Sequence, residues 1–332
     1  MRKDLLLRVR GLTTAIQTKS GRFDAVRDVS FDLHRREKVA IIGESGSGKS
    51  LTALSLIGLL PHPVAQVTAG EVVFDGVDLT TAEPETLRKL RGRRIGMLFQ
   101  DPMTSLNPLL TIRRQLFEAV ESHFLWPQDR IEERARTLLR RVQIDDPDRV
   151  MGQHPHQLSG GMRQRVMLAI ALMCSPDLII ADEPTTALDV TVQREVIGLL
   201  RELTEAEECA IIFISHDINL VSEFADRILV MYAGRVVEAG PTAEICHRPR
   251  HPYTADLLRS IPRIDEPRRE ELLTIEGHPP AIGALPRGCA YHPRCRVAVT
   301  TCRSDEPAFR PVGIRHGAAC FQLSLTEGAH LE

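Results

Sequence analysis

The stretch Gly43-Glu44-Ser45-Gly46-Ser47-Gly48-Lys49-Ser50 has the pattern G-x-x-x-x-G-K-S. It follows the apolar residues 39–42, which predict a buried strand, and precedes residues 51–60, which predict a helix. A phosphate-binding loop needs this order of strand, loop and helix, because its glycines turn successive backbone N–H groups toward phosphate oxygens. A Gly/Ser-rich turn that binds nothing is the alternative, and both flanks argue against it. We therefore expect the loop to bind nucleotide phosphates.

The end of this loop carries the side chains with the clearest chemistry. A helix that starts at Lys49 directs its positive dipole end at the phosphates. We expect Lys49 to reach the β- and γ-phosphates of ATP and the Ser50 hydroxyl to ligate Mg²⁺. The predicted ATP-binding residues are Gly43, Glu44, Ser45, Gly46, Ser47, Gly48, Lys49, Ser50 and Leu51.

Composition narrows the class of protein. The chain has 332 residues and 43% hydrophobic content, which suffices for packed cores in about two domains. A formal net charge of −2 and only 4% aromatic residues offer neither a basic field nor stacking platforms, so no nucleic-acid partner is expected. No apolar run approaches the ~20 residues of a membrane-spanning helix, and early charges argue against a signal peptide. These features predict a cytosolic chain without disulfides.

Strand and helix patterns alternate along much of the chain. Short apolar runs predict buried strands at residues 95–99, 178–181 and 210–214, with helical patterns between and after them. This alternation predicts an α/β fold around a parallel sheet. Residues 5–36 predict an added antiparallel sheet, and residues of about 101–175 predict a helical subdomain.

Polar side chains follow three of the predicted parallel strands. Asp182 and Glu183 end one of them, Gln100 ends another, and His216 follows the third. Alone, each is an ordinary polar residue at a strand end, but carboxyl ends of parallel strands beside a phosphate loop are where Mg²⁺ and the attacking water are handled. We expect Asp182 to bind Mg²⁺ mainly through water, with Ser50 and Gln100 as further ligands. Glu183 is expected to polarise the attacking water and His216 to contact the γ-phosphate, so the predicted catalytic residues are Glu183, His216 and Gln100.

A second phosphate-binding element follows at residues 158–165, Leu-Ser-Gly-Gly-Met-Arg-Gln-Arg. Ser159 is a typical helix N-cap, and the two glycines expose backbone N–H groups at the helix start. One chain cannot wrap both elements around one ATP if they lie on opposite faces, whereas two chains arranged head-to-tail can. The residues predicted to face the ATP of a partner are Ser159, Gly160, Gly161, Arg163 and Gln164.

Together these motifs resemble the ATP-binding subunit of an ABC transporter. Residues 43–50 are similar to the Walker A loop of that family, Gln100 to its Q-loop and residues 158–162 to its signature. The remaining matches are residues 178–183 to Walker B, residues 187–189 with Asp189 to the D-loop, and His216 to the switch histidine.

The resemblance covers residues 5 to about 245. It implies a P-loop ABC ATPase domain with a RecA-like parallel core, an N-terminal antiparallel β-subdomain and a helical subdomain. It also implies a head-to-tail ATPase dimer that ATP closes and hydrolysis reopens. In the family, adenine stacks on an aromatic residue. The matching position in this sequence is Ile16, and Phe23 is the nearest aromatic residue.

Further strings resemble the oligopeptide/dipeptide importer branch of this family: residues 99–108, 251–254, 275–280 and 288–295. This branch implies an ATP-hydrolysing subunit that powers import of di- or oligopeptides from the cytoplasmic face of the membrane, where it is peripherally bound. The implied partners are a paralogous ABC ATPase subunit, two transmembrane permease subunits and an extracytoplasmic solute-binding protein. Nickel, opines or glutathione-like solutes are alternative cargoes. A soluble ABC ATPase outside transport is the other alternative, although the coiled-coil or tandem insertions of such proteins are missing.

The C-terminal part differs in composition. Prolines become frequent after about residue 241, and we divide the chain into an ATPase domain, residues 1–245, and a small Pro/Cys-rich extension, residues 246–332. The extension contains Cys289, Cys295, Cys302 and Cys320, without a C-x-x-C pair. Their spacing suits zinc poorly, whereas a [4Fe–4S] cluster tolerates varied spacing, and the branch resemblance also suggests such a cluster. Zn²⁺, free thiols and oxidised pairs remain alternatives. A bound metal would couple folding of this small extension to metal binding.

Overall fold

The computed structural model describes residues 4–101, 105–185, 189–260 and 274–323. The chain divides into two compact units. The first unit consists of residues 1–7, 32–38 and 74–214, and the second of residues 8–31, 39–73 and 215–332. Neither unit is one continuous piece of sequence.

Parallel strands form the sheet of the first unit. β7 (Leu178–Asp182) pairs in parallel with β6 (Ile95–Leu98) and with β8 (Ala210–Ser215). Every residue of β7 and β8 is buried, as expected for apolar strands covered on both faces. The predicted α/β architecture is thereby confirmed in this unit. The short strand β5 (Val77–Asp78) lies before β6 in the chain.

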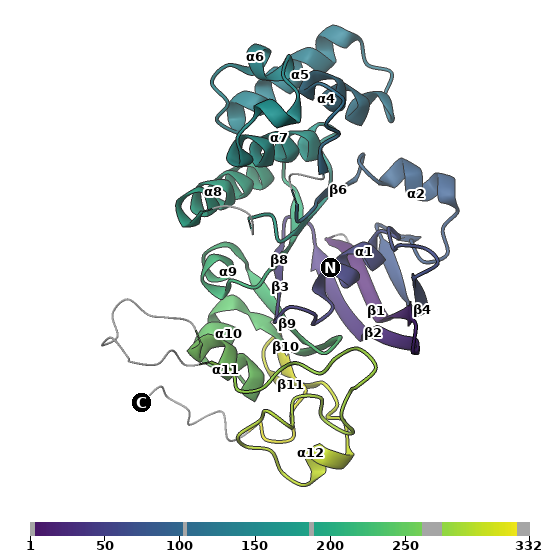
Figure 1. Ribbon diagram of the computed structural model, residues 1–332, viewed down its shortest axis with the longest axis vertical. Helices are drawn as coiled ribbons and strands as arrows, with labels where there is room; N and C mark the ends of the chain where they lie inside the picture. Colours follow the sequence, from purple (N-terminus) through teal and green to yellow (C-terminus); the bar gives the residue numbers. More distant parts are fainter. Residues whose placement is uncertain (1–3, 102–104, 186–188, 261–273, 324–332) are drawn as a thin grey trace. The chain divides into compact units, whose positions relative to one another are not determined.

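Helices make up most of the rest of the first unit: α2 (Pro84–Leu90), α4 (Ile112–Glu121), α5 (Gln128–Arg141), α6 (Pro147–Met151), the 3₁₀ turn η1 (Pro155–Gln157), α7 (Gly160–Leu172) and α8 (Val190–Ala206). Figure 1 shows α4, α5, α6 and α7 side by side. Within the described ranges, no helix combines the length and apolar character needed to cross a bilayer.

Helix α5 shows how an amphipathic pattern lets a helix pack against its neighbours in this unit. Its buried residues are Ile131, Ala135, Leu138 and Leu139, spaced as one helical face. This spacing agrees with the helical interpretation of the sequence.

Three strands that lie mostly in the second unit, β1 (Leu5–Thr18), β2 (Gly21–His34) and β4 (Ala65–Phe74), are neighbours in the order β2-β1-β4. Two residues connect β1 and β2, a length typical of a hairpin. Both β1 and β2 lie within residues 5–36, for which the sequence predicted an added sheet, and they continue through Gly11 and Asp28 although both residues have positive φ angles.

β3 (Lys38–Ile42) leads into the phosphate loop and α1 (Lys49–Leu56), and it pairs in parallel with β9 (Arg227–Tyr232). Helix α9 (Ile218–Phe224) precedes β9. β10 (Arg235–Pro241) returns antiparallel to β9 through Ala233 and Gly234, which both have positive φ. This two-residue connection between β9 and β10 has a length typical of a hairpin.

The extension joins this sheet, which the sequence did not predict. Helix α10 (Thr242–His247) crosses into the extension, whose further elements are α11 (Pro252–Arg259), α12 (Thr301–Ser304), β11 (Arg310–Gly313) and β12 (His316–Ala318). β12 pairs antiparallel with β10 and β11 pairs with β12, so two late strands lengthen the sheet edge (Figure 1). The His316 ring covers Gly240, where an added Cβ would lie 2.8 Å from a ring carbon.

Candidate functional site

The phosphate loop is pressed against neighbouring backbone at two of its glycines. Gly43 has φ +154°, and a Cβ there would lie 2.2 Å from the carbonyl oxygen of Met231. Gly48 has φ +99°, and a Cβ there would lie 2.9 Å from the carbonyl oxygen of Ala25. Both positions therefore exclude a side chain, and the path of the loop is set by close packing as well as by its turn.

Lys49 is buried, and its Nζ donates hydrogen bonds to the carbonyl oxygens of Gly43 (2.8 Å) and Glu44 (3.1 Å). Ser47 is also buried, and its Oγ has no hydrogen-bond partner among the described residues. A buried ammonium group and an unsatisfied hydroxyl at a helix N-terminus fit the phosphate oxygens of a nucleotide. The other predicted ATP-binding positions are exposed or half-buried: Ser45, Gly46, Gly48, Ser50 and Leu51.

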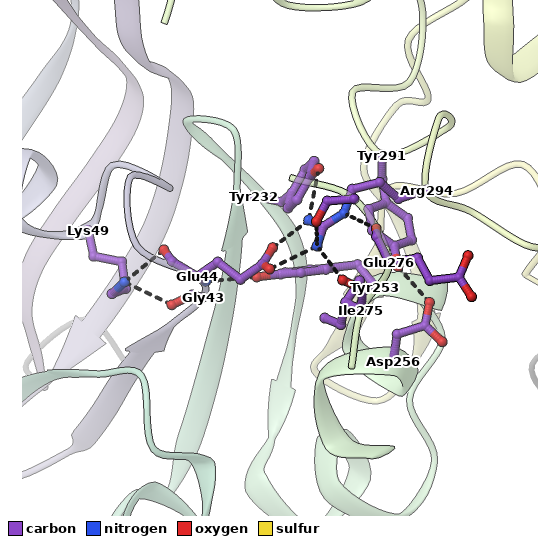
Figure 2. Close-up of polar contacts among 11 residues, drawn as sticks. Gly43, Glu44, Lys49, Tyr232, Tyr253, Asp256, Ile275, Glu276, Tyr291 and Arg294 are labelled. Carbon is purple, nitrogen blue, oxygen red and sulfur yellow. Dashed lines mark hydrogen bonds and ion pairs between the residues drawn. The ribbon is translucent and has the colours of Figure 1, made fainter. Parts of the chain in front are cut away.

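Glu44 is held through both its backbone and its side chain (Figure 2). Its N–H donates to the hydroxyl of Tyr253 at 2.8 Å. Its carboxylate accepts two hydrogen bonds from the Arg294 guanidinium, at 2.6 and 2.9 Å. Both partners lie beyond residue 245, so the C-terminal extension contacts the phosphate loop directly.

Three tyrosines, all that the chain contains, pack together beside this contact: Tyr232, Tyr253 and Tyr291. Their ring centroids are 4.6 to 5.3 Å apart. The Tyr291 hydroxyl donates to the Asp256 carboxylate at 2.5 Å. Burial raises the pKa of each tyrosine hydroxyl.

The carboxyl end of β7 carries the two predicted acids. Asp182 is buried, and Glu183 follows it half-buried with φ +45°. The Glu183 N–H donates to the carbonyl oxygen of Ile214 at 3.0 Å, and Gln100 Nε2 donates to Glu183 Oε2 at 3.2 Å. Left-handed backbone is uncommon at a glutamate and concentrates at functional sites. The structure thus brings Gln100 and Glu183 together.

The start of α7 matches the expected N-cap. Ser159 Oγ accepts a hydrogen bond from the N–H of Met162 at 3.3 Å. Gly160 is exposed, and no atom lies within 4 Å of the place where its Cβ would be. The half-buried Gly161 lies against Val192. The helix start is therefore accessible at Ser159 and Gly160.

The two polar residues that follow bond within the same unit. Arg163 Nε donates to the carbonyl oxygen of Pro155 at 2.7 Å. Gln164 is buried, and its side-chain amide donates to the carbonyl oxygen of Pro184, one residue beyond Glu183. These contacts link the start of α7 to the end of β7.

The remaining motif residues lie at element ends. The Asp189 carboxylate accepts from the N–H of Val192 at 3.0 Å, before the first turn of α8. His216 is exposed and directly follows β8. Residues 187–188 of the predicted D-loop and residues 102–104 of the string at 99–108 lie outside the described residues.

All four extension cysteines, Cys289, Cys295, Cys302 and Cys320, line one pocket. Burial raises the pKa of the Cys295 thiol to about 11 and also raises the pKa of Cys289 and Cys320. Among the described residues, no three His, Cys, Asp or Glu side chains are grouped closely enough to hold a metal ion. The four cysteines predicted to bind a metal thus line one pocket, but the described residues contain no preformed ion site.

Comparison with known proteins identifies the family. The sequence model of the family described as ABC transporter matches residues 26–186. The sequence model of a second family, described as oligopeptide/dipeptide transporter, C-terminal region, matches residues 237–302. A peptide import ATP-binding protein of Brucella melitensis is 45% identical over 97% of this chain and 98% of its own length. The chain belongs to the ABC transporter ATP-binding family.

Other members of this ABC family agree. The dipeptide transport ATP-binding protein DppD of Escherichia coli is 44% identical to this chain, over 95% of this chain and 96% of its own length. The dimeric ATP-binding cassette MJ0796, solved with ADP and phosphate, has a TM-score of 0.63 and 29% identity, over 71% of this chain and 99% of its own. These likenesses confirm the ABC cassette fold and the resemblance on which the sequence analysis relied.

Sequence reasoning missed the residues that hold Glu44. Tyr253 and Arg294 lie within strings that indicated the importer branch, but neither string pointed to the phosphate loop. The separation between Glu44 and Arg294 is 250 residues, so no local periodicity relates them. Phe23, the nearest candidate for adenine stacking, lies against Gly283, where an added Cβ would be 2.8 Å from its ring.

Proposed function

We propose that this ABC ATPase powers the import of di- or oligopeptides as one subunit of a membrane transporter. The observation that carries this proposal is the 45% identity to a peptide import ATP-binding protein over 97% of the chain. The match to an oligopeptide/dipeptide C-terminal region at residues 237–302 supports the same branch.

In this function, the loop at residues 43–50 holds the ATP phosphates, with Lys49 on the β- and γ-phosphates. Ser50, Gln100 and Asp182 provide the Mg²⁺ environment, in which the ion neutralises phosphate charge. Glu183 polarises the attacking water and His216 contacts the γ-phosphate. The buried, unsatisfied Ser47 hydroxyl and the contact between Gln100 and Glu183 support these assignments.

The start of α7 is the basis for the proposed partner subunit. We propose that Ser159, Gly160 and Gly161 bind the ATP of a paralogous ATPase subunit, with Arg163, Gln164 and Asp189 supporting that contact. The exposed cap of α7 supports this arrangement. Two permease subunits and an extracytoplasmic solute-binding protein complete the transporter, and this chain lies at the cytoplasmic face of the membrane. The division into an ATPase domain, residues 1–245, and an extension, residues 246–332, belongs to the same proposal.

For the extension, we propose a [4Fe–4S] cluster bound by Cys289, Cys295, Cys302 and Cys320. A single Zn²⁺ needs thiolates about 2.3 Å from one centre, and the four thiols around the pocket are not grouped for such an ion. A larger cluster is compatible with ligands spread around a pocket. Anaerobic purification should yield iron, inorganic sulfide and a brown absorbance that Cys295→Ser removes. Stoichiometric zinc without iron would instead favour the zinc alternative.

Transport itself is tested by reconstitution. The chain is co-expressed with two candidate permease subunits and a paralogous ATPase subunit, and the complex is placed in proteoliposomes with a candidate solute-binding protein. We expect ATP-dependent uptake of a labelled dipeptide or tetrapeptide and matching ATP hydrolysis. Uptake of Ni²⁺ with no peptide uptake would contradict the proposed cargo, and ATP hydrolysis without any transport would contradict the proposed class.

A further inference from the structure

Arg294 occupies the centre of a network between the extension and the phosphate loop (Figure 2). Its side chain is 5% exposed. Its Nε donates to the carbonyl oxygen of Glu276 at 2.9 Å, and both terminal nitrogens donate to the Glu44 carboxylate. The hydrogen bonds with Glu44 raise the pKa of the Arg294 guanidinium above its ordinary value. The guanidinium is therefore a permanent cation with a fixed orientation.

The surroundings of Arg294 fix it further. One terminal nitrogen also donates to the Tyr232 hydroxyl at 3.4 Å, and the other reaches the carbonyl oxygens of Ile275 and Gly277 at 3.3 and 3.4 Å. The guanidinium carbon lies 5.9 Å from the ring centroids of both Tyr232 and Tyr291. A bidentate arginine with this many partners restrains the carboxylate that it binds.

Glu44 connects Arg294 to the rest of the phosphate loop. Its carboxylate is bound by Arg294 and its N–H by Tyr253, while its carbonyl oxygen accepts from Lys49 Nζ. One residue thus joins the extension to the lysine expected on the phosphates. Without Arg294, the side chain of Glu44 would lose its anchor, and ATP would have to order a looser loop on binding.

We propose that Arg294 is a positioning residue for ATP binding, through which the extension preorganises the phosphate loop by way of Glu44. The inference rests on the proposed ATPase function. It predicts a change in ATP affinity and little change in the chemical step, because Arg294 acts through Glu44 on the loop expected to hold the ATP phosphates.

The experiment uses the full chain in the assembled transporter and measures ATPase kinetics. For Arg294→Gln we expect the KM for ATP to rise about tenfold with kcat within about twofold, because binding is lost equally in ground and transition states. Arg294→Lys, which keeps the charge but loses the bidentate geometry, should lie between. Arg303→Ala, at an exposed arginine of the same extension, is the matched control and should leave both parameters unchanged.

Glu44→Gln and the Glu44→Gln/Arg294→Gln pair separate this route from general damage to the extension. If the pair acts as one unit, the double variant should have the KM of the single variants rather than the product of their effects. Hydrogen exchange of peptides covering residues 43–50 should increase in each variant. An unchanged KM for Arg294→Gln, or multiplicative effects in the double variant, would overturn the inference. If the unmodified transporter does not hydrolyse ATP, the proposed function itself is refuted.

Discussion

His316 and Glu238 form a buried pair, in which Nε2 and Oε1 are 2.8 Å apart and the side chains are 3% and 0% exposed. The same carboxylate accepts backbone hydrogen bonds from Arg250 at 2.6 Å and His251 at 2.9 Å. Glu238 therefore lies at the meeting point of β10, the segment before α11, and β12. One carboxylate on β10 thus holds two other segments, at residues 250–251 and at His316.

Replacement of Glu238 should be more damaging than replacement of His316. Glu238→Ala leaves three donors without their acceptor and should cost about 3–5 kcal/mol. His316→Ala removes one hydrogen bond to a carboxylate that keeps two backbone donors, and should cost about 2 kcal/mol. Hydrogen exchange of peptides covering residues 250–254 and 310–318 measures both effects. Equal protection in the two variants would contradict this order.

His251 should make the extension sensitive to acid. Burial lowers the pKa of His251 from 6.5 to about 4, outweighing the nearby Glu238 carboxylate and a hydrogen bond with the Ala319 backbone, which raise it. The ring of Tyr291 also faces it. Because the unfolded chain binds a proton that the folded chain resists, this contribution is fully present above pH 6.5 and falls as pH drops toward 4. The loss is about 1 kcal/mol by pH 5.5.

The variant His251→Asn tests this acid sensitivity. His251 Nδ1 accepts the N–H of Tyr253 at the N-cap of α11, and the asparagine oxygen can accept the same bond. Unfolding midpoints measured between pH 7.5 and 5 should therefore fall less steeply in the variant than in the original chain. The same slope in both proteins would exclude His251 as the titrating group.

Glu183→Gln should trap ATP. The substitution removes the carboxylate that polarises water but keeps a side chain able to contact Gln100, so nucleotide binding should survive. ATP turnover of the transporter should fall at least about a hundredfold, in the range of a lost general base, with ATP retained in a closed dimer. Retained nucleotide is measured after gel filtration, and unchanged turnover would refute the role of Glu183.

Lys49→Ala should abolish tight ATP binding. The variant removes the buried ammonium group that bonds to the carbonyl oxygens of Gly43 and Glu44 and is expected on the phosphates. Affinity should fall by about two orders of magnitude, which corresponds to nearly 3 kcal/mol. Equilibrium binding of a fluorescent ATP analogue measures the change, with Lys19→Ala in an exposed turn as the control. Normal binding by Lys49→Ala would contradict the assignment.

The predictable parts of this fold have local physical causes. The apolar residues 178–181 indicate a buried strand, and Ile131 and Ala135 are spaced as one face of a helix. The glycines of the loop at residues 43–50 predict a turn whose backbone lies close to phosphate. Each of these signals lies within one short window of sequence.

The unpredicted parts depend on long-range contacts. The pairing of β12 with β10 joins residues 238 and 318, which no periodicity relates. Arg294 and Glu44 read as ordinary charges in separate segments, and only the fold shows that they meet. The left-handed backbone at Glu183 likewise comes from its position after β7 rather than from its residue type.

The distribution of aromatic residues gives the chain separate optical reporters. Its three tyrosines surround the contact between the extension and the phosphate loop, whereas its one tryptophan, Trp126, stacks on Phe124 beside Arg130 among the helices of the other unit. Tyrosine absorbance and tryptophan emission therefore follow different units in the unlabelled protein. Nucleotide titrations can observe both signals at once, and the order in which they change gives the order in which the units respond.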